Sequence, residues 1–357
     1  MLADMAALRR ALAGLVSSPL TVMEVCGTHT VSIFRSGIRS LLPPGLRLVS
    51  GPGCPVCVTD QGEIEAAVSL LEEGAIVAAY GDMFRVPCAR GSLSSKREEG
   101  YDPRIILSAM DALAIAMDNP AREVVFLAVG FETTAPATAA LLLEAQSRGT
   151  GNLSVLSFHK RTPPALEVLA GDPGLGISGF LLPGHVSVIL GHDPFRFLAE
   201  RHGRPSVIAG FDPVQILLGL VEIARQHGEG RAELKSVYGR AVRPEGNGKA
   251  KRLLETVFEE RNAPWRGIGV IPASGMGIRE EFSSWDASRR FSLEVRPGTP
   301  PAGCRCGEVL TGRITPLDCP LFRKGCTPLS PVGPCMVSSE GTCGAYFRFC
   351  KGESDVR

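Results

Sequence analysis

The chain has 357 residues, of which 44% are hydrophobic and 21% charged, and its 38 Lys and Arg nearly balance 37 Asp and Glu. This composition excludes intrinsic disorder, because the chain has ample apolar residues and little net charge. It also argues against bulk nucleic-acid binding and against adhesion to an anionic membrane. The apolar runs are far shorter than the roughly 20 residues that span a bilayer, and the N-terminus lacks a signal-peptide pattern, so a cytoplasmic location is expected.

The chain is too long to fold around a single hydrophobic core, so two or three domains are expected. The first α/β domain is predicted over residues 1–120. It begins with an amphipathic helix and contains three short, β-branched apolar runs that are typical of buried parallel strands, at residues 20–25, 46–51 and 75–80. Asp60 and Glu63 form a capping pair at the start of the helix between the last two strands.

A second α/β domain is predicted over residues 121–285. Its strands are expected at residues 123–131, 153–160, 178–186 and 205–211. Thr133 or Thr134 caps the following helix, with Pro136 in its first turn. The pairs Asp212-Pro213 and Asp193-Pro194 are expected to open two more helices. Consecutive βα units of this kind predict doubly wound parallel sheets.

The remaining segment, residues 286–357, is expected to form a small third domain. Residues 297–335 are rich in Pro, Gly and Cys and cannot build an apolar core without a covalent cross-link or a bound metal. The chain has 11 cysteines in all, and in a reducing compartment such a number indicates metal ligation or thiol chemistry rather than structural disulfides.

The first cysteine motif is Glu24-Val25-Cys26-Gly27-Thr28-His29-Thr30, which follows a predicted strand. It is therefore expected at the carboxyl end of a sheet, where open α/β sheets place their ligands. A thiolate and an imidazole three residues apart can both reach one metal, or the imidazole can lower the thiol pKa. The alternative is a small buried cysteine beside a surface histidine, and these residues alone leave both interpretations open.

The second motif is Gly51-Pro52-Gly53-Cys54-Pro55-Val56-Cys57, between a predicted strand and a helix. A C-x-x-C pair in this position has thioredoxin-like spacing, and a nearby helix N-terminus favours the thiolate. The alternative is half of a zinc site, which needs further ligands from Cys26 and His29 or from Cys88. Redox or soft-metal chemistry is the stronger interpretation.

The third cluster comprises seven cysteines in the last part of the chain: Cys304, Cys306, Cys319, Cys326, Cys335, Cys343 and Cys350. Four thiolates can hold a [4Fe–4S] cluster or a zinc ion. Zinc modules usually show two C-x2–4-C pairs, whereas these spacings are irregular and wide, which suits a cluster better. The spacing does not identify the four ligands, and Cys350 is the thiol least expected among them.

Other polar residues follow predicted strands and fall on the same edge as Cys26. Glu132 and His185 can act in proton transfer or as support for a metal ligand, although helix capping and turn formation explain them more simply. Residues 273–277 are predicted to form a Gly-rich loop. The sequence has no Walker A motif, so we assign no nucleotide binding.

Five blocks of this sequence resemble the signature blocks of the HypD family of hydrogenase maturation factors. They are CGTHT at residues 26–30, GPGCPVC at 51–57, GFETTAP at 130–136, PGHVS at 183–187 and GPCMVSSEG at 333–341. The blocks occur in family order and together cover nearly the whole chain, so the resemblance is far more specific than any one block.

The resemblance implies two α/β domains and a C-terminal domain that carries a [4Fe–4S] cluster. It also implies a scaffold that, with the small chaperone HypC, holds an iron while that iron acquires two cyanides and one carbon monoxide. In this family the cyanide comes from HypE. The Fe(CN)2CO group is then passed to the hydrogenase large-subunit precursor.

The resemblance also implies roles for individual residues. Cys26 is the expected iron ligand, with His29 beside it, and Cys54 and Cys57 are expected to shuttle electrons or assist iron binding. Glu340 is expected to support the C-terminal domain or proton movement. The cluster ligands are expected among Cys304, Cys306, Cys319, Cys326, Cys335 and Cys343. Two cysteines match no family block, Cys88 and Cys350.

Three other functions compete with this one. A thiol-disulfide reductase driven by an iron–sulfur cluster would use the same cysteines without iron-bound diatomic ligands. A zinc-stapled binding module would have no redox role. An α/β metabolic enzyme would carry these thiols incidentally, but the cysteine-rich tail and the missing nucleotide fingerprint count against it.

Overall fold

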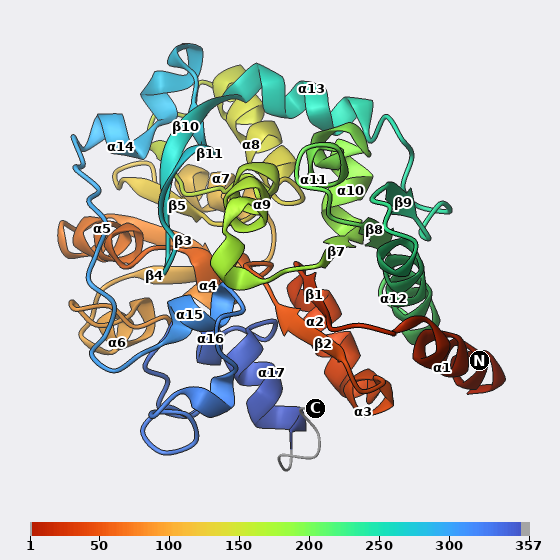
Figure 1. Ribbon diagram of the computed structural model, residues 1–357. Coiled ribbons are helices and arrows are strands. Elements are labelled where there is room, and N and C mark those ends of the chain that lie inside the picture. Colours follow the sequence, from red (N-terminus) through yellow and green to blue (C-terminus); the bar gives the residue numbers. More distant parts are fainter. Residues whose placement is uncertain (1, 351–357) are drawn as a thin grey trace.

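Two parallel β-sheets lie side by side in the computed structural model, which describes residues 2–350 (Figure 1). Sheet A contains, in spatial order, β2 (Leu46–Ser50), β1 (Leu20–Glu24), β7 (Gly179–Pro183), β8 (Ser206–Ala209) and β9 (Leu234–Ser236). Sheet B contains β4 (Pro103–Ile106), β3 (Ile76–Tyr80), β5 (Val124–Ala128) and β6 (Leu153–Ser157). All neighbouring strands in both sheets are parallel, which confirms the predicted α/β class.

The assignment of strands to the two sheets differs from a division at residue 120. The chain makes β1 and β2 of sheet A, then all of sheet B, and then returns to sheet A for β7, β8 and β9. Strands from both predicted segments, 1–120 and 121–285, therefore contribute to each sheet. The βα pattern marks each strand locally but carries no information about which of two similar sheets the strand joins.

Helices cover both faces of the sheets, and Asp60 and Asp212 cap two of them as predicted. The longer ones are α1 (Leu2–Leu15), α2 (Gly27–Arg35), α5 (Gln61–Glu72), α7 (Ala109–Asp118), α8 (Ala135–Arg148), α9 (Thr162–Gly171), α10 (Gly184–Leu190), α12 (Pro213–Gly228) and α13 (Gly248–Val257). The shorter ones are α3 (Ile38–Leu41), α4 (Pro55–Val58), α6 (Leu93–Glu98), α11 (Phe197–Glu200) and α14 (Ala287–Arg290). Asp60 and Glu63 form the expected capping box of α5, whereas Thr134 begins α8 without a side-chain cap.

One hydrophobic core joins the two sheets. It includes Met23 and Val49 from sheet A, Val77 and Leu127 from sheet B, and residues of α5 and α9. Separate clusters fill the outer faces, between sheet B and α7, α8 and α13 and between sheet A and α1 and α12. Strands covered on both faces explain the near-continuous apolar runs in the sequence.

One predicted element is wrong. Residues 273–277 form no loop but belong to β11 (Gly269–Ile278), which pairs antiparallel with β10 (Phe258–Trp265). The helix expected after Asp193-Pro194 is short and irregular, because a 3-10 turn over Asp193–Phe195 precedes the single-turn helix α11. The β10–β11 hairpin is stabilised by packing against α9 and β6, which the local sequence does not reveal.

The cysteine-rich C-terminal region consists of short helices and loops with a small core of its own. Its helices are α15 (Cys306–Leu310), α16 (Pro334–Val337) and α17 (Thr342–Phe349), and α17 packs against α2. Residues 286–290, assigned to the third predicted domain, pack instead at the edge of sheet B, and residues 351–357 lie outside the described residues.

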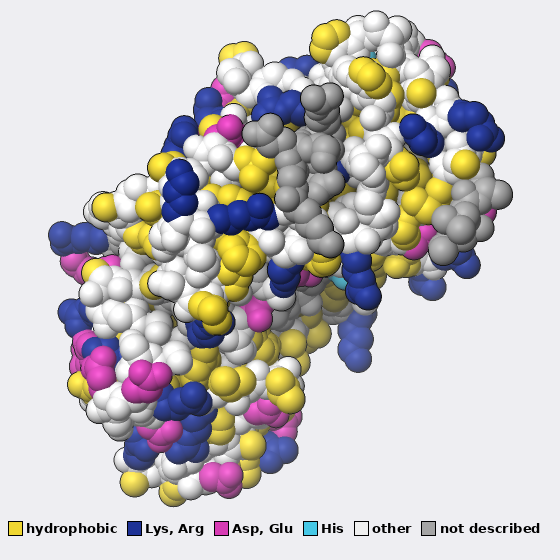
Figure 2. All heavy atoms as spheres, turned by 90° about the horizontal axis from the view of Figure 1, so that it is seen from below, with side chains coloured by type: hydrophobic (Ala, Val, Ile, Leu, Met, Phe, Trp, Pro, Cys, Tyr) yellow, Lys and Arg dark blue, Asp and Glu magenta, His cyan; other side chains and the backbone are white. Residues whose placement is uncertain are grey.

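Seen from below, the molecule is elongated, with hydrophobic, basic and acidic side chains interspersed over the visible face (Figure 2). Within residues 2–350, no helix has both the length and the apolar character needed to cross a membrane.

Candidate functional site

A cavity of about 220 Å³ lies where the carboxyl ends of the two sheets meet. Sheet A contributes the loops after β1, β2 and β7, and sheet B contributes the loop after β5 and the start of α9. The tip of the β10–β11 hairpin and one C-terminal residue complete the wall. The residues that line the cavity include Cys26, Thr28, Gly53, Phe131, His185, Trp265 and Glu340. In sheet A the strand order reverses between β1 and β7, and such switch points are where α/β folds bind ligands.

Cys26 is the N-cap residue of α2 at this cavity, and its backbone is hydrogen-bonded to the buried carboxyl group of Glu24. The backbone N–H of Cys26 donates to Glu24 Oε2 at 3.1 Å, and Thr30 Oγ1 donates to Glu24 Oε1 at 2.5 Å. Burial raises the pKa of Glu24 to about 7. Burial, together with the negative charges of Glu340 and Glu24, raises the pKa of the Cys26 thiol to about 12. Cys26 therefore keeps its proton at neutral pH unless a bound metal displaces it.

The first two cysteine motifs touch through their backbones. Gly27 N–H donates to the carbonyl oxygen of Gly53 at 3.1 Å. A Cβ atom on Gly53 would lie 2.3 Å from the Cys26 nitrogen. The close approach explains why glycine occupies position 53.

Cys54 and Cys57 form a disulfide at the start of α4. Cys54 is the N-cap residue, and its sulfur accepts the backbone N–H of Cys57 at 3.2 Å. Ser338 Oγ lies 3.3 Å from the same sulfur. The two cysteines are only 3% and 0% exposed, so the disulfide is closed to large partners.

The six cysteines predicted to include the cluster ligands line a single small cavity: Cys304, Cys306, Cys319, Cys326, Cys335 and Cys343. The neighbouring Cys306 thiol, and to a smaller extent the charge of Arg266, lower the pKa of Cys304 to about 7. Cys350 packs instead in the neighbouring core with Phe34 and Tyr346.

No group of three or more His, Cys, Asp or Glu side chains within residues 2–350 is arranged to hold a single metal ion. A [4Fe–4S] cluster does not require its ligands to converge on one ion, because each thiolate binds a separate iron of the cluster. Six thiols around one cavity, three of them buried and three partly buried, suit such a cluster in donor chemistry.

One short stretch of chain contacts all three thiol sites. Cys335, on α16, lines the six-cysteine cavity. Ser338 contacts the Cys54 sulfur, and Glu340 lines the Cys26 cavity, where its Oε1 accepts the Thr28 hydroxyl at 2.6 Å. Three sites that are far apart in the sequence are thus connected by six consecutive residues.

Comparison with known proteins agrees with this arrangement. Residues 3–350 match the sequence profile of HypD, described as the "Hydrogenase formation hypA family". The chain is 46% identical over 336 residues to the hydrogenase maturation factor HypD of Azotobacter vinelandii, covering 92% of this chain and 89% of the relative. It is 40% identical over 340 residues to the HypD of Escherichia coli, covering 95% and 91%.

The chain belongs to the HypD family. Its role is therefore in hydrogenase maturation, as the sequence blocks predict.

Two histidines of this HypD-family chain lie on either side of Phe211. The structure does not place His29 in the cavity with Cys26: its imidazole is fully buried, and Nε2 lies 2.9 Å from the carbonyl oxygen of Gly210. Burial lowers the pKa of His29 to about 4, so the ring is neutral. His185 is exposed, lines the cavity and stacks on Phe211 with ring centroids 4.0 Å apart.

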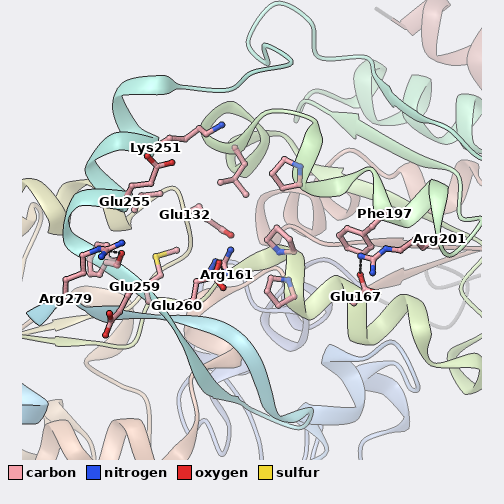
Figure 3. A pocket seen from close by; sticks show the side chains of 17 residues that line it. Glu132, Arg161, Glu167, Phe197, Arg201, Lys251, Glu255, Glu259, Glu260 and Arg279 are labelled. Atoms are coloured by element: carbon pink, nitrogen blue, oxygen red, sulfur yellow. Dashed lines mark hydrogen bonds and ion pairs between the residues drawn. The ribbon is translucent and has the colours of Figure 1, made fainter.

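Glu132 takes the capping role in this HypD-family chain, not a role at the Cys26 cavity. Its carboxylate accepts the backbone N–H of Thr162 at 2.7 Å and the Thr162 hydroxyl at 2.8 Å, which caps the start of α9. Glu132 also lines a larger cavity of about 780 Å³ on the other side of α9 (Figure 3). That cavity contains no cysteine, and two of its arginines form ion pairs with carboxylates that line it, Arg201 with Glu167 and Arg161 with Glu260.

Sequence reasoning included Glu24 in the first motif without giving it a role, although a carboxylate inside an apolar strand requires a buried partner or a function. It missed Trp265, which lines the cavity of this HypD-family chain, since the β10–β11 hairpin itself was not predicted.

Proposed function

We propose that this chain is the scaffold on which an Fe(CN)2CO group is assembled together with HypC, before transfer to the hydrogenase large subunit. In this proposal the iron is the cargo and Cys26 holds it. The observation that carries the proposal is the stretch from Cys335 to Glu340, which contacts the six-cysteine cavity, the disulfide and the Cys26 cavity.

The size and chemistry of the Cys26 cavity support this cargo. A soft thiolate suits iron with strong-field ligands. Three diatomic ligands, even at twice the roughly 30 Å³ volume of a water each, leave room for iron in about 220 Å³. The walls contributed by Phe131 and Trp265, which stack at 6.0 Å between ring centroids, restrict water.

The six-cysteine cavity would hold a [4Fe–4S] cluster through four of its thiolates. When bound, such a cluster supplies electrons one at a time. Reduction of the Cys54–Cys57 disulfide to two thiols takes two electrons and two protons. The Ser338 hydroxyl is positioned to hydrogen-bond the Cys54 sulfur, and Glu340 offers a carboxylate at the cargo site to accept or return protons.

Partners in this proposal approach the exposed side of the Cys26 cavity. His185, which is exposed there, and the proline-rich loops around it form a rim that the small chaperone HypC would cover. HypE would deliver cyanide through the same opening.

An iron–sulfur-dependent thiol-disulfide reductase is the alternative, and the burial of the disulfide argues against it. A protein substrate must bring its own sulfur in line with Cys54 or Cys57, which are 3% and 0% exposed. The pair is better suited to exchange electrons within the chain.

The test is an infrared spectrum of the protein purified anaerobically with HypC. We expect bands of metal-bound cyanide and carbon monoxide, together with iron and acid-labile sulfide. Cys26→Ala should abolish the bands and leave the iron–sulfur absorption unchanged.

Cys88→Ala is the matched control, because Cys88 lies outside all three thiol sites. It should retain the bands. Bands that persist in Cys26→Ala contradict Cys26 as the ligand, and wild-type protein without iron contradicts the proposed function as a whole.

A further inference from the structure

A further cavity of about 230 Å³ lies beside the start of α5 and strand β10, and it shares no lining residue with the three cavities described above. Its walls come from α5, the loop after β6, β10 and the segment from α14 to residue 295. The residues that line it are Glu63, Phe158, Arg261, Asn262, Pro264, Ser288, Leu293 and Val295. At roughly 30 Å³ for each water, this volume equals that of about seven water molecules, enough for a small organic molecule.

The guanidinium of Arg261 is the charge at this cavity that has no counter-charge. Its Nη2 donates to the carbonyl oxygen of Ser157. Within residues 2–350, Arg261 forms no ion pair with a carboxylate, and its Nε and Nη1 have no hydrogen-bond partner. The other charged residue in the wall, Glu63, is already paired with the buried ammonium of Lys160 and accepts the backbone N–H of Asp60. A bound anion would therefore meet one uncompensated cation.

The local backbone directs Arg261 toward the cavity. Arg261 lies opposite Gly275 in the β10–β11 hairpin. A Cβ atom on Gly275 or Gly277 would lie 3.1 Å or 3.3 Å from side-chain carbons of Arg261, so the two glycines leave room for its stem. The register shifts between Arg261 and Ala263, and Asn262 at this bulge also lines the cavity. Bulges redirect side chains and are frequent next to functional sites.

Two neutral donors line the same cavity. Asn262 Oδ1 accepts the backbone N–H of Ala273 at 3.1 Å, which leaves the Nδ2 group of this amide as a free donor. The hydroxyl of Ser288 has no hydrogen-bond partner within the described part of the chain. The carboxylate of Asp286 is already engaged, since it accepts the backbone N–H of Ser288 at 2.9 Å and pairs with Arg289 at 3.6 Å.

We propose that this cavity is a binding site for a short-chain organic monocarboxylate. The planar guanidinium of Arg261 matches the two oxygens of a carboxylate, and such charge-assisted pairs are stronger than neutral hydrogen bonds. Four apolar side chains would contact the hydrocarbon part of the ligand, which inorganic phosphate lacks: Phe158, Pro264, Leu293 and Val295. A few placed polar groups among apolar walls are typical of small-molecule sites.

Strand β10 connects this monocarboxylate site to the Cys26 cavity. Pro264 lines the monocarboxylate site, and the next residue, Trp265, lines the Cys26 cavity. A bound carboxylate would therefore contact the strand that forms one wall of the Cys26 cavity. The site itself requires no iron, so it stands or fails independently of the scaffold function proposed above.

The experiment is a ligand-observed NMR titration of the full chain with three probes of similar length, n-butyrate, butyramide and n-butylamine. We expect butyrate to bind about tenfold or more tightly than butyramide, because only the carboxylate forms a charge-assisted pair with Arg261. Arg261→Gln should weaken butyrate binding by a similar factor. Leu293→Trp, which fills the cavity and leaves the guanidinium in place, should weaken it as well.

Arg279→Gln is the matched control. Arg279 is also partly buried, forms no ion pair with a carboxylate within residues 2–350, and donates from Nε to the carbonyl oxygen of Phe258 at 3.1 Å. It lines the larger cavity of about 780 Å³ instead. Arg279→Gln should therefore bind butyrate as wild type does.

Three results would overturn the proposal. They are no binding of butyrate to wild type, equal affinities for butyrate and butyramide, and tighter binding of n-butylamine, which would make Glu63 the recognising group. Inorganic phosphate that binds more tightly than butyrate would contradict the ligand class. If Arg261→Gln does not fold, Leu293→Trp decides, and wild-type affinity for butyrate in that variant contradicts the site.

Discussion

At the scale of single residues, Gly53 sets how closely the two motif loops approach. Its Cα faces the backbone of Cys26, and atoms of the backbone cannot move aside as the end of a flexible side chain can. This close approach keeps Cys26 and Pro55, at the start of α4, in one wall of the cavity.

Gly53→Ala is therefore expected to destabilise the protein by about 1–3 kcal/mol, the usual cost of overpacking a closed site. The measurement is the free energy of unfolding in urea. Gly239→Ala is the control, because no atom lies within 4 Å of a Cβ built there, and its effect should stay within about 0.5 kcal/mol. Equal effects of the two changes contradict the steric argument.

His159 makes stability depend on pH. The ring is fully buried, Nε2 lies 2.8 Å from Thr138 Oγ1, and burial lowers the pKa from 6.5 to about 3. Between those pH values the unfolded chain binds a proton that the folded chain does not, so stability falls as the pH falls below 6.5. The slope from this residue is about 1.4 kcal/mol per pH unit.

His159→Gln should remove that slope while keeping a hydrogen-bonding group near Thr138. Urea unfolding at several pH values between 7.5 and 4.5 provides the measurement. His227→Gln, at a half-buried position near Ser18, is the control substitution. A wild-type slope in His159→Gln would show that other groups carry the effect.

At the residue scale, sequence motifs identify residues that the structure brings together. Cys26, the Cys54–Cys57 pair and Glu340 were predicted from their motifs and lie in one region, while their roles stay predictions. The expected place of His29 beside Cys26 in the cavity is not found, because its buried ring points to the carbonyl oxygen of Gly210.

At the scale of elements, a buried ion pair joins α5 to the loop after β6. Lys160 Nζ and a Glu63 carboxylate oxygen form this pair, and both side chains are 1% exposed. Glu63 also accepts the backbone N–H of Asp60 at 2.9 Å, so the pair is anchored to the helix start.

Lys160→Met should lower the free energy of unfolding by about 3–5 kcal/mol, because it leaves the Glu63 carboxylate buried without its partner. The double change Glu63→Gln with Lys160→Met should be less destabilising than Lys160→Met alone, since glutamine keeps the cap and carries no charge. Thermal and urea unfolding of the single and double variants tests this.

Arg148→Met serves as the control for the ion pair. Arg148 pairs with Glu144 on the surface of α8, and exposed pairs of this kind contribute about 0.3–0.5 kcal/mol. If Lys160→Met lowers the free energy of unfolding by no more than Arg148→Met does, the prediction that the buried pair stabilises the fold is contradicted.

Element prediction from sequence was good for the buried strands and poor for the hairpin. Seven of the nine strands that the two sheets contain within residues 2–350 are short apolar runs, and such runs are recognisable without homologues. The edge strands β4 and β9 were not predicted, because they are short and carry a charged residue. The β10–β11 hairpin has mixed burial, a shift in register near Arg261 and no alternation to indicate strands. It forms because α9 and β6 offer it a surface.

At the scale of the whole molecule, the candidate site belongs to neither sheet alone. The Cys26 cavity takes its walls from loops of both sheets, from the β10–β11 hairpin and from Glu340. The predicted division at residue 120 could not reveal this arrangement, because both sheets are built from similar βα units. What assigns a strand to a sheet is packing between distant segments.

The interleaved order of the strands also bears on how the protein is made. Sheet B is contiguous in the chain, from Ile76 to Ser157, and can close while the polypeptide is still leaving the ribosome. The first two strands of sheet A are translated earlier, yet β1 lacks its second neighbour until β7 emerges at Gly179. The loop that carries Cys26 is thus synthesised before sheet B and enclosed after it.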